Sequence, residues 1–323
     1  MKDRDKIIQR LKNEQSFYLI SHMLPDGDSI GSLLAMGEGL LSLGKQVRLF
    51  TPGQIPKKYA FLKGSELVSS EVLMDDPDVT IIVLDSSDLD RLDLFKEAVS
   101  KSRQIINIDH HITNQHFGTL NLVDPSAAAT GEIVYHLLED LQVKLTGSIA
   151  ESLYVAIATD TGSFKYDNTT SNTHRVVADL LEFGLSPGTL SQIMFDERPL
   201  SFYILLKDAL SSLEMYAGRR IAVMSLSKDI RERSGATTDD LDGIVNYTRN
   251  IEGIELGILF YVDSNSEVKV GFRSKSLDVS ILAGKFNGGG HAKAAGCRLH
   301  GDFETVKEQV MKEALSMLND LPA

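Results

Sequence analysis

Apolar runs alternate with amphipathic segments through the first half of the chain. Runs with the length and β-branched content of buried strands lie at residues 17–21, 47–50, 79–84 and 105–108. Segments with helical periodicity separate them, at residues 3–13, 30–43 and 91–101. Strands that alternate with helices favour right-handed crossovers and a parallel sheet. We therefore expect an α/β protein whose N-terminal domain is a doubly wound, mainly parallel sheet.

The second half has a different pattern. Strands are expected at 220–226, 254–262 and 267–273, with a hairpin turn at 263–266. Helices are expected at 200–215, 239–249, 278–286 and 303–318. Because a hairpin joins antiparallel strands, we predict a smaller C-terminal α/β domain with a mixed sheet. The predicted domains are residues 1–188 and 200–323, joined by a linker at 189–199.

The composition is that of a globular protein. The chain has 323 residues, of which 42% are hydrophobic and 24% charged. No stretch approaches the roughly 18 uninterrupted apolar residues of a membrane span, and the N-terminus has no apolar signal core. We therefore expect a soluble cytoplasmic protein with no membrane partner. The single cysteine, Cys297, excludes an intramolecular disulfide and thiolate metal sites, and is expected to be a small buried apolar residue.

The charge of the chain limits its partners. A formal net charge of -12 argues against binding of long nucleic acid, so a polyanionic partner should be short. The segment 271–298 is the exception, with five basic residues and only Asp278 as an acid. This segment could be a solvated basic face, but it overlaps the glycines at 288–290. The overlap favours a local phosphate-binding surface.

Polar side chains follow several of the predicted strands. His22 comes directly after the first strand, Asp85 after the third, and Asp109-His110-His111 closes the fourth. In an open α/β sheet, ligands bind outside the carboxyl ends of the strands, so these side chains should meet. Asp26 and Asp28 follow His22 and would each, alone, be explained as helix caps. Asp160 alone would be a turn residue, and only the constellation makes these carboxylates metal ligands.

The converging groups are two imidazoles and four carboxylates, without sulfur. They are His22, Asp26, Asp28, Asp85, His110 and Asp160. This donor set suits a hard to borderline divalent ion such as Mn²⁺, and six ligands are too many for one site. We therefore expect two ions, roughly 3.5–4 Å apart, in the arrangement that clamps an in-line displacement at phosphorus. Asp85 is the candidate for a shared, bridging ligand.

These segments resemble a known family. His22-Met23-Leu24-Pro25-Asp26-Gly27-Asp28-Ser29, Asp85, Asp109-His110-His111 and Asp160 resemble the four motifs of the DHH phosphoesterases. That family includes RecJ-type nucleases, manganese pyrophosphatases and nanoRNases. Gly288-Gly289-Gly290-His291 resembles the signature of the DHH-associated C-terminal domain. The resemblance covers essentially the whole chain, and the layout is most similar to the stand-alone members that cleave very short RNA and phosphoadenosine phosphate.

The resemblance implies a role for each residue. One ion would take His22, Asp26 and Asp85, and the other Asp28, Asp85, His110 and Asp160. His111 would contact the scissile phosphate, Asp109 would orient its neighbours, and Asp85, Asp109 and His111 would be the catalytic residues. The second domain would hold the rest of the nucleotide through Arg273, Gly288, Gly289, Gly290 and His291.

The resulting hypothesis is a manganese-dependent phosphodiesterase of the exoribonuclease type. It would hydrolyse short oligoribonucleotides or dinucleotides to mononucleotides, with 3′-phosphoadenosine 5′-phosphate as a further substrate. A phosphodiesterase for cyclic di-AMP or its linear product pApA is the nearest alternative, and a pyrophosphatase is less favoured because such enzymes lack the Gly-Gly-Gly-His segment. A catalytically inactive nucleotide-binding regulator would lack a metal ligand, and none is missing. A homodimer is left open.

Overall fold

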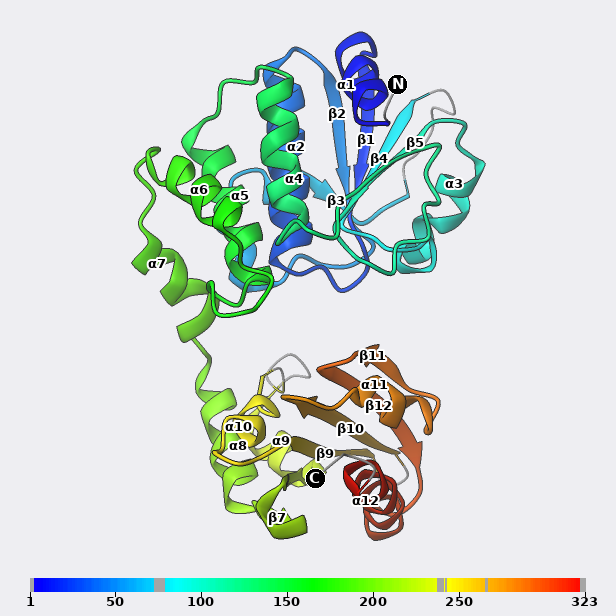
Figure 1. Ribbon diagram of the computed structural model, residues 1–323, viewed down its shortest axis with the longest axis vertical. Helices are drawn as coiled ribbons and strands as arrows, with labels where there is room; N and C mark the ends of the chain where they lie inside the picture. The colour runs from blue at the N-terminus through cyan, green and yellow to red at the C-terminus, as the bar shows by residue number, and fades with distance from the viewer. Residues whose placement is uncertain (1–2, 73–78, 237–240, 242, 265–266, 320–323) are drawn as a thin grey trace. The chain divides into compact units, whose positions relative to one another are not determined.

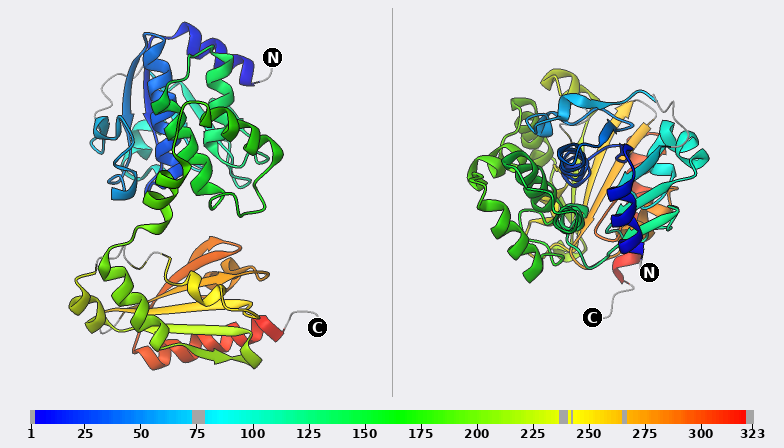
Figure 2. Two further views of the ribbon diagram at one scale, coloured as in Figure 1. Left: turned by 90° about the vertical axis from the view of Figure 1, so that its left-hand side faces the viewer. Right: turned by 90° about the horizontal axis from the view of Figure 1, so that it is seen from above.

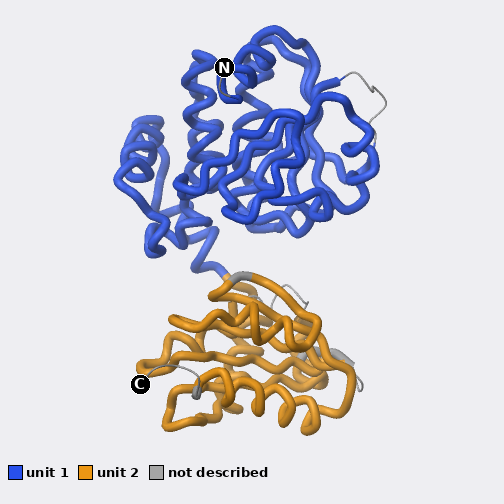
Figure 3. The backbone as a smooth tube through the Cα atoms, turned by 45° about the vertical axis from the view of Figure 1, so that its right-hand side comes forward, with its two compact units in different colours: residues 1–197 blue, residues 198–323 orange. Residues whose placement is uncertain are grey.

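The computed structural model divides the protein into two compact units. It describes residues 3–72, 79–236, 241, 243–264 and 267–319. Unit 1 comprises residues Met1–Glu197 and unit 2 residues Arg198–Ala323 (Figure 3). In the described residues, no helix is both long enough and apolar enough to cross a membrane.

Unit 1 is built on a six-stranded parallel sheet with the order β3-β2-β1-β4-β5-β6. Its elements are α1 (Asp3–Asn13), β1 (Ser16–Ile20), α2 (Gly27–Ser42), β2 (Gln46–Phe50), β3 (Val68–Ser69), β4 (Thr80–Leu84), α3 (Lys96–Lys101), β5 (Ile105–Asp109), β6 (Leu120–Val123), α4 (Thr130–Asp140), α5 (Gly147–Asp160), α6 (Ser171–Leu181) and α7 (Pro187–Ser191). The direction of winding reverses between β1 and β4. Such a switch point is where open α/β sheets bind ligands.

Both faces of this sheet are buried, which explains the nearly uninterrupted apolar runs of its strands. In β1, Phe17 and Leu19 pack into the core formed with α1, α2, α4 and α5. The alternate residues Tyr18 and Ile20 pack into a second core, which includes Val99 of α3. Figure 1 shows α2 and α4 on one side of the strands and α3 on the other. The prediction of a doubly wound parallel sheet is confirmed.

The chain between the units is mostly helical. Helix α7 is followed directly by a single π-helical turn, Gln192–Asp196. Leu190 and Met194 are buried in the core of unit 1. Most of the segment predicted as a linker, 189–199, therefore packs with unit 1.

Unit 2 contains a mixed six-stranded sheet, as predicted, with the order β11-β12-β10-β9-β8-β7. Its elements are α8 (Leu200–Ser211), β7 (Glu214–Tyr216), β8 (Ile221–Leu226), α9 (Lys228–Ser234), α10 (Asn246–Arg249), β9 (Leu256–Ser264), β10 (Glu267–Ser274), α11 (Val279–Gly284), β11 (Gly289–His291), β12 (Ala294–His300) and α12 (Phe303–Asn319). Among the strands that the structure describes in this unit, only β8 and β9 pair in parallel. One core includes α12, red in Figure 2, and another includes α8. The single cysteine, Cys297, is buried in the α12 core.

Three details of unit 2 differ from the expected elements. The helix predicted to reach residue 215 ends at Ser211, and β7 follows. The hydroxyl of Ser212 accepts from the Ser225 backbone N–H at 2.8 Å and donates to its carbonyl at 2.9 Å, which ties the chain to β8. Of the helix predicted at 239–249, residues 239, 240 and 242 lie outside the described part, and α10 covers only the end. Helix α9 was not predicted.

Candidate metal centre

The predicted metal ligands come together at the carboxyl edge of the unit 1 sheet. His22 follows β1, Asp85 follows β4 and His110 follows β5, and β4 lies between the other two strands. In the described part of the chain, three groups have ligand atoms within 4.8 Å of one another: His22 with Asp26 and Asp85; Asp28 with His110 and Asp160; and Asp85 with His110 and His111. Asp85 belongs to two of them. His110 also belongs to two, so Asp85 and His110 together link the three groups, and the bridging role of Asp85 stays a prediction.

His22 presents an unpaired nitrogen to this cluster. Its Nδ1 lies 2.6 Å from the carbonyl oxygen of Met23, which can only accept, and 3.1 Å from Arg91 Nη2, which can only donate. The shorter contact, to Met23, favours a hydrogen on Nδ1. Its buried Nε2 has no hydrogen-bond partner and lies 3.3 Å from Asp85 Oδ2 and 4.0 Å from Asp26 Oδ1. Burial lowers the pKa of His22, which favours the neutral ring. A lone pair facing two carboxylates is an arrangement that a cation would complete.

His110 repeats this arrangement on the other side of Asp85. Its Nε2 lies 3.3 Å from Asp160 Oδ2 and 3.8 Å from both Asp28 Oδ2 and Asp85 Oδ1. Burial alone would lower the pKa of His110, but the charges of Asp28 and Asp160 outweigh burial and raise it. Three carboxylates therefore surround one imidazole nitrogen, as expected of a site that holds positive charge.

The carboxylates are themselves strongly perturbed. Burial, followed by the charge of Asp28, raises the pKa of Asp85 well above its ordinary value. Burial also raises the pKa of Asp28, and it raises that of Asp160 to about 7. Asp85 in addition adopts a φ of 60°, a conformation that costs a non-glycine residue roughly 1–3 kcal/mol. Clustered carboxylates and backbone strain oppose stability, which is typical of a functional site.

The N-terminus of α4 holds Asp28 in place. The backbone N–H groups of Thr130 and Gly131 donate to the two oxygens of Asp28 at 2.6 and 2.9 Å, and Ser32 Oγ donates at 2.9 Å. The hydroxyl of Thr130 also donates to Asp85 Oδ1 at 3.0 Å. A helix N-terminus favours a carboxylate. Thr130 could not be recognised as functional from the sequence, where its signal is the run of small residues that precedes it at the start of this helix.

Asp26 caps a helix, which is the alternative role considered for it, and it also lies in the cluster of proposed ligands. It is the N-cap of α2 and accepts a hydrogen bond from the Ser29 backbone N–H at 3.0 Å. Its side chain is half exposed, unlike that of Asp28. Capping alone would therefore account for Asp26, and metal binding by this residue stays a prediction.

Asp109 orients His111 and does not join any of the three groups. Its two oxygens accept from His111 Nδ1 at 2.7 Å and from Asn114 Nδ2 at 2.6 Å. Burial alone would raise the pKa of Asp109, but these hydrogen bonds outweigh it and the pKa is lowered. The side chain of Asn114 also donates to Asn107 Oδ1 at 2.8 Å. Asn114 was missed from the sequence, where its only signal was its place in the loop after His111.

The glycines of unit 2 form an edge strand instead of the predicted loop. Gly289–His291 pairs with the start of β12. A Cβ on Gly288 or Gly290 would overlap the neighbouring β12 backbone, and Gly290 has a φ of 141°, so packing requires glycine at both positions. A Cβ on Gly289 would meet only open space. The side chain of His291 lies outside the described part of the structure.

Arg273 is fixed on β10 of unit 2. Its Nε donates to Asn246 Oδ1 of α10 at 3.0 Å, and its Nη1 donates to the carbonyl of Phe272 at 3.0 Å. These bonds restrict the side chain before any ligand arrives. Arg273 is therefore a preorganised cation, which suits a phosphate contact.

Part of the basic segment 271–298 is neutralised by acids outside it. Lys285 Nζ lies 2.7 Å from Glu313, and Arg298 Nη1 lies 3.8 Å from Glu267. The predicted phosphate-binding surface is therefore narrower than the count of basic residues suggests.

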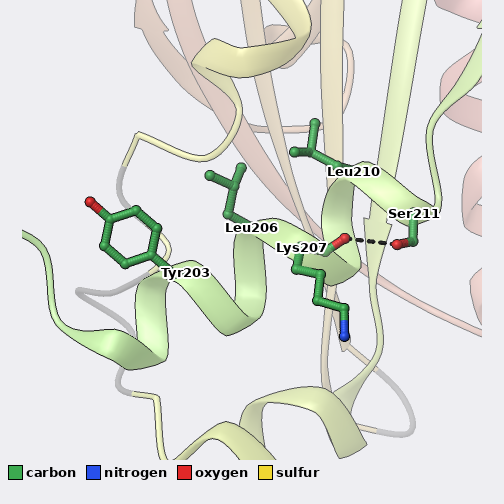
Figure 4. A pocket seen from close by; sticks show the side chains of 5 residues that line it. All are labelled: Tyr203, Leu206, Lys207, Leu210 and Ser211. Carbon is green, nitrogen blue, oxygen red and sulfur yellow. Dashed lines mark hydrogen bonds between the residues drawn. The ribbon is translucent and has the colours of Figure 1, made fainter.

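A shallow hollow on α8 offers no comparable chemistry. It is lined by Tyr203, Leu206, Lys207, Leu210 and Ser211 (Figure 4). No carboxylate or imidazole is among these side chains, and the hydroxyl of Ser211 donates to the backbone carbonyl of Lys207 at 2.9 Å. The hollow does not supply metal ligands.

Comparison with known families supports the motif assignment. Residues 16–157 match the model of the DHH family, N-terminal domain, and residues 218–321 match that of the DHHA1 domain. These are the two domain types that the motifs around His22 and Gly288 resemble.

Curated relatives extend the match over nearly the whole chain. The bifunctional oligoribonuclease and PAP phosphatase NrnA of Thermus thermophilus is 35% identical over 302 residues, which cover 93% of this chain and 89% of the relative. The NrnA of Bacillus subtilis is 28% identical over 304 residues, or 92% of this chain and 93% of the relative.

Solved structures share the fold. An exopolyphosphatase-related protein from Bacteroides fragilis superposes with a TM-score of 0.90 at 25% identity, over 98% of both chains. Exonuclease RecJ bound to manganese gives a TM-score of 0.56 at 12% identity, over 100% of this chain and 95% of the other. At that identity, the RecJ comparison shows the fold alone.

Proposed function

Because the chain belongs to the DHH family of phosphoesterases, we propose that it hydrolyses very short oligoribonucleotides to mononucleotides, with 3′-phosphoadenosine 5′-phosphate as a second substrate. The observation that carries this proposal is the convergence of His22, His110 and four aspartates at the switch point of the sheet. The names of the NrnA relatives support the choice of substrate. The cytoplasmic location stays a prediction.

We infer that the cluster would hold two divalent ions. One would be held by His22, Asp26 and Asp85, and the other by Asp28, Asp85, His110 and Asp160. The orphaned Nε2 of His22 and the oxygen-rich donor set fit such ions, and Mn²⁺ suits mixed imidazole and carboxylate ligands. When bound, the ions would supply positive charge against the developing charge of the phosphoryl group and would lower the pKa of water.

The protein's own side chains would position the phosphate. His111 donates from Nδ1 to Asp109, so the ring is oriented and its Nε2 is directed away from that carboxylate. We propose that Nε2 contacts the scissile phosphate. Asp109, with its pKa lowered, would remain ionised and hold the His111 ring in orientation through Nδ1, while Asn114 holds Asp109 in place. The catalytic residues proposed from the sequence, Asp85, Asp109 and His111, thus have distinct roles.

The second domain would bind the remainder of the nucleotide. We keep the division of roles proposed from the sequence, with catalysis in residues 1–188 and substrate binding in 200–323. Of the predicted linker, 189–199, the part up to residue 197 belongs to unit 1. Arg273 would supply charge from a restrained guanidinium. Gly289 would allow close approach of a phosphate, because it alone among Gly288, Gly289 and Gly290 has open space where a Cβ would be. His291 would complete this set.

A substrate panel tests the proposal. Purified protein with Mn²⁺ is assayed against a linear diribonucleotide, 3′-phosphoadenosine 5′-phosphate, cyclic di-AMP, pApA and pyrophosphate. We expect the linear dinucleotide to be hydrolysed with the highest kcat/KM. A preference for cyclic di-AMP or pyrophosphate would replace the proposed substrate class, and a protein that binds nucleotides without hydrolysing any of them would be a regulator. Light scattering on the same sample determines whether the protein is a dimer.

A further inference from the structure

A tyrosine in the loop that follows Asp160 has no part in the roles described so far. Tyr166 follows α5, and its side chain is 53% exposed. Its ring covers Gly162, because a Cβ added to that glycine would overlap three ring atoms. Gly162 has a φ of 56°, which suits glycine. One part of the ring is therefore packed against backbone, and the rest is open to solvent.

The turn that carries this ring is well fixed. Gly162 is two residues beyond Asp160, whose Oδ2 lies 3.3 Å from His110 Nε2. The Tyr166 N–H donates to the carbonyl of Thr161 at 3.1 Å, and the side chain of Asn168 donates to the carbonyl of Asp160 at 3.2 Å. The position of the ring is thus tied to that of a proposed metal ligand.

Two other loops of the centre also expose large apolar side chains. Leu24 lies between His22 and Asp26, and Ile112 directly follows His111, and each is 87% exposed. Single exposed apolar side chains are common on protein surfaces. These differ because, together with Tyr166, they occupy three of the segments that carry the clustered ligands. Each of the three exposed side chains therefore belongs to a loop that also carries a proposed metal ligand or its neighbour.

We propose that Tyr166 is a stacking platform for a nucleobase of the substrate, adjacent to the scissile phosphate, with Leu24 and Ile112 providing apolar contacts. This inference rests on the proposed function and adds a determinant of specificity within unit 1 itself. Stacking on an aromatic ring accepts any base, because every base has a π-face. The site would therefore favour base-bearing phosphodiesters over base-free phosphates, would tolerate different base sequences, and would prefer purines for their larger surface.

The test compares a base-bearing substrate with a base-free one. Steady-state kinetics with Mn²⁺ are measured on a diadenosine dinucleotide and on the same dinucleotide with its bases removed. Tyr166→Ala should lower kcat/KM on the diadenosine substrate about 10-fold, mainly through KM, and leave the abasic substrate within about 2-fold. Tyr166→Phe, which keeps the ring, should retain wild-type values on both. Ile112→Ser should show a smaller loss in the same direction.

The control is Phe183→Ala, which removes an exposed aromatic side chain of unit 1 from a segment without proposed ligands. It should leave kcat/KM unchanged on both substrates. The ratio between the two substrates does not depend on how much of a variant is folded. If Tyr166→Ala lost kcat/KM equally on both substrates, or lost none, the stacking role would be overturned. The proposed function would still stand in that case, because the wild-type protein would be active. Wild-type protein that hydrolyses neither substrate would instead refute the proposed function, and the stacking role with it.

Discussion

The carboxyl edge of the unit 1 sheet and the glycine strand of unit 2 were both predicted as functional from short motifs, but their physical character differs. At the edge of the sheet, buried Asp28 and Asp85 have raised pKa values and Asp85 has a strained backbone. These features work against folding. In the glycine strand, Gly288 and Gly290 are required by packing against β12.

The difference shows which motif is stronger support for function. Packing alone gives no reason to bury several carboxylates together. Their burial at the metal centre therefore supports the binding of a cation. Packing does give a reason for two of the three glycines, so their presence alone says little about phosphate binding. Gly289 and Arg273 are the positions in unit 2 where function and packing can be separated.

Asp85→Asn should have the largest effect on activity. Loss of the proposed bridging ligand removes several kcal/mol of charge stabilisation, so kcat/KM should fall at least about 1,000-fold. In chelator, the melting temperature should stay the same or rise, because one of several repelling buried carboxylates is gone. Asp90→Asn, a matched change of an exposed acid in the following segment, should leave both quantities unchanged. Near-wild-type turnover of Asp85→Asn at saturating Mn²⁺ would contradict the bridging role.

Arg273→Ala should weaken capture of the nucleotide. Loss of one charge-assisted contact should cost about 10- to 100-fold in kcat/KM on a dinucleotide, with metal affinity unchanged. His291→Ala should act in the same direction. Hydrolysis of bis-p-nitrophenyl phosphate, which lacks the distal nucleotide, should suffer much less.

Lys269→Ala provides the control for Arg273, since it removes a cation from the same face of β10. If the dinucleotide and the generic ester lost activity equally in Arg273→Ala, this residue would belong to the chemical step or the fold, and the division of roles between the two domains would fail.

Gly289→Ala separates substrate approach from packing. The added methyl meets open space, so the melting temperature should not change, but a closely approaching phosphate would be blocked and kcat/KM should fall about 10-fold. Gly288→Ala is the matched comparison, and its overlap with β12 should cost about 1–3 kcal/mol of stability. Unchanged activity in Gly289→Ala would leave the glycine strand with a purely structural role.

The smallest expected effect concerns pH. The pKa of Asp160 is raised to about 7, so the folded, metal-free protein holds this proton more tightly than the unfolded chain. The resulting stability is complete below the ordinary carboxyl pKa and is lost as the pH rises through about 7. In chelator, Asp160→Asn should therefore raise the melting temperature at pH 8 by about 2–4 °C relative to wild type, and not at pH 4.5. An equal shift at both pH values would contradict this account.

Much of unit 1 could be predicted from the sequence because its signals are local. Strands buried on both faces give continuous apolar runs, and the polar residues that follow β1, β4 and β5 mark one edge of a parallel sheet. Thr130 and Asn114 could not be found in this way. Their roles come from contacts with Asp28 and Asp109, made by segments whose own patterns show only a helix start and a loop.

The strands and helices of unit 2 were harder to predict because its sequence pattern is ambiguous. Glycines normally weaken strands, so Gly289–His291 was expected to be a loop, but pairing with β12 requires the close backbone approach that glycine allows. The end of α8 was missed for another reason. The segment to residue 215 has no Gly or Pro stop signal, and the chain leaves the helix through the hydroxyl of Ser212, whose partner, Ser225, is distant in sequence.

Calorimetric titration of metal-free protein with Mn²⁺, paired with a dinucleotide assay in chelator, determines whether the cluster is a two-metal catalytic centre. We expect two Mn²⁺ ions per chain in wild type, weakened binding in Asp85→Asn, and no hydrolysis until metal is restored. Full hydrolysis by chelator-treated, metal-free protein would contradict this expectation.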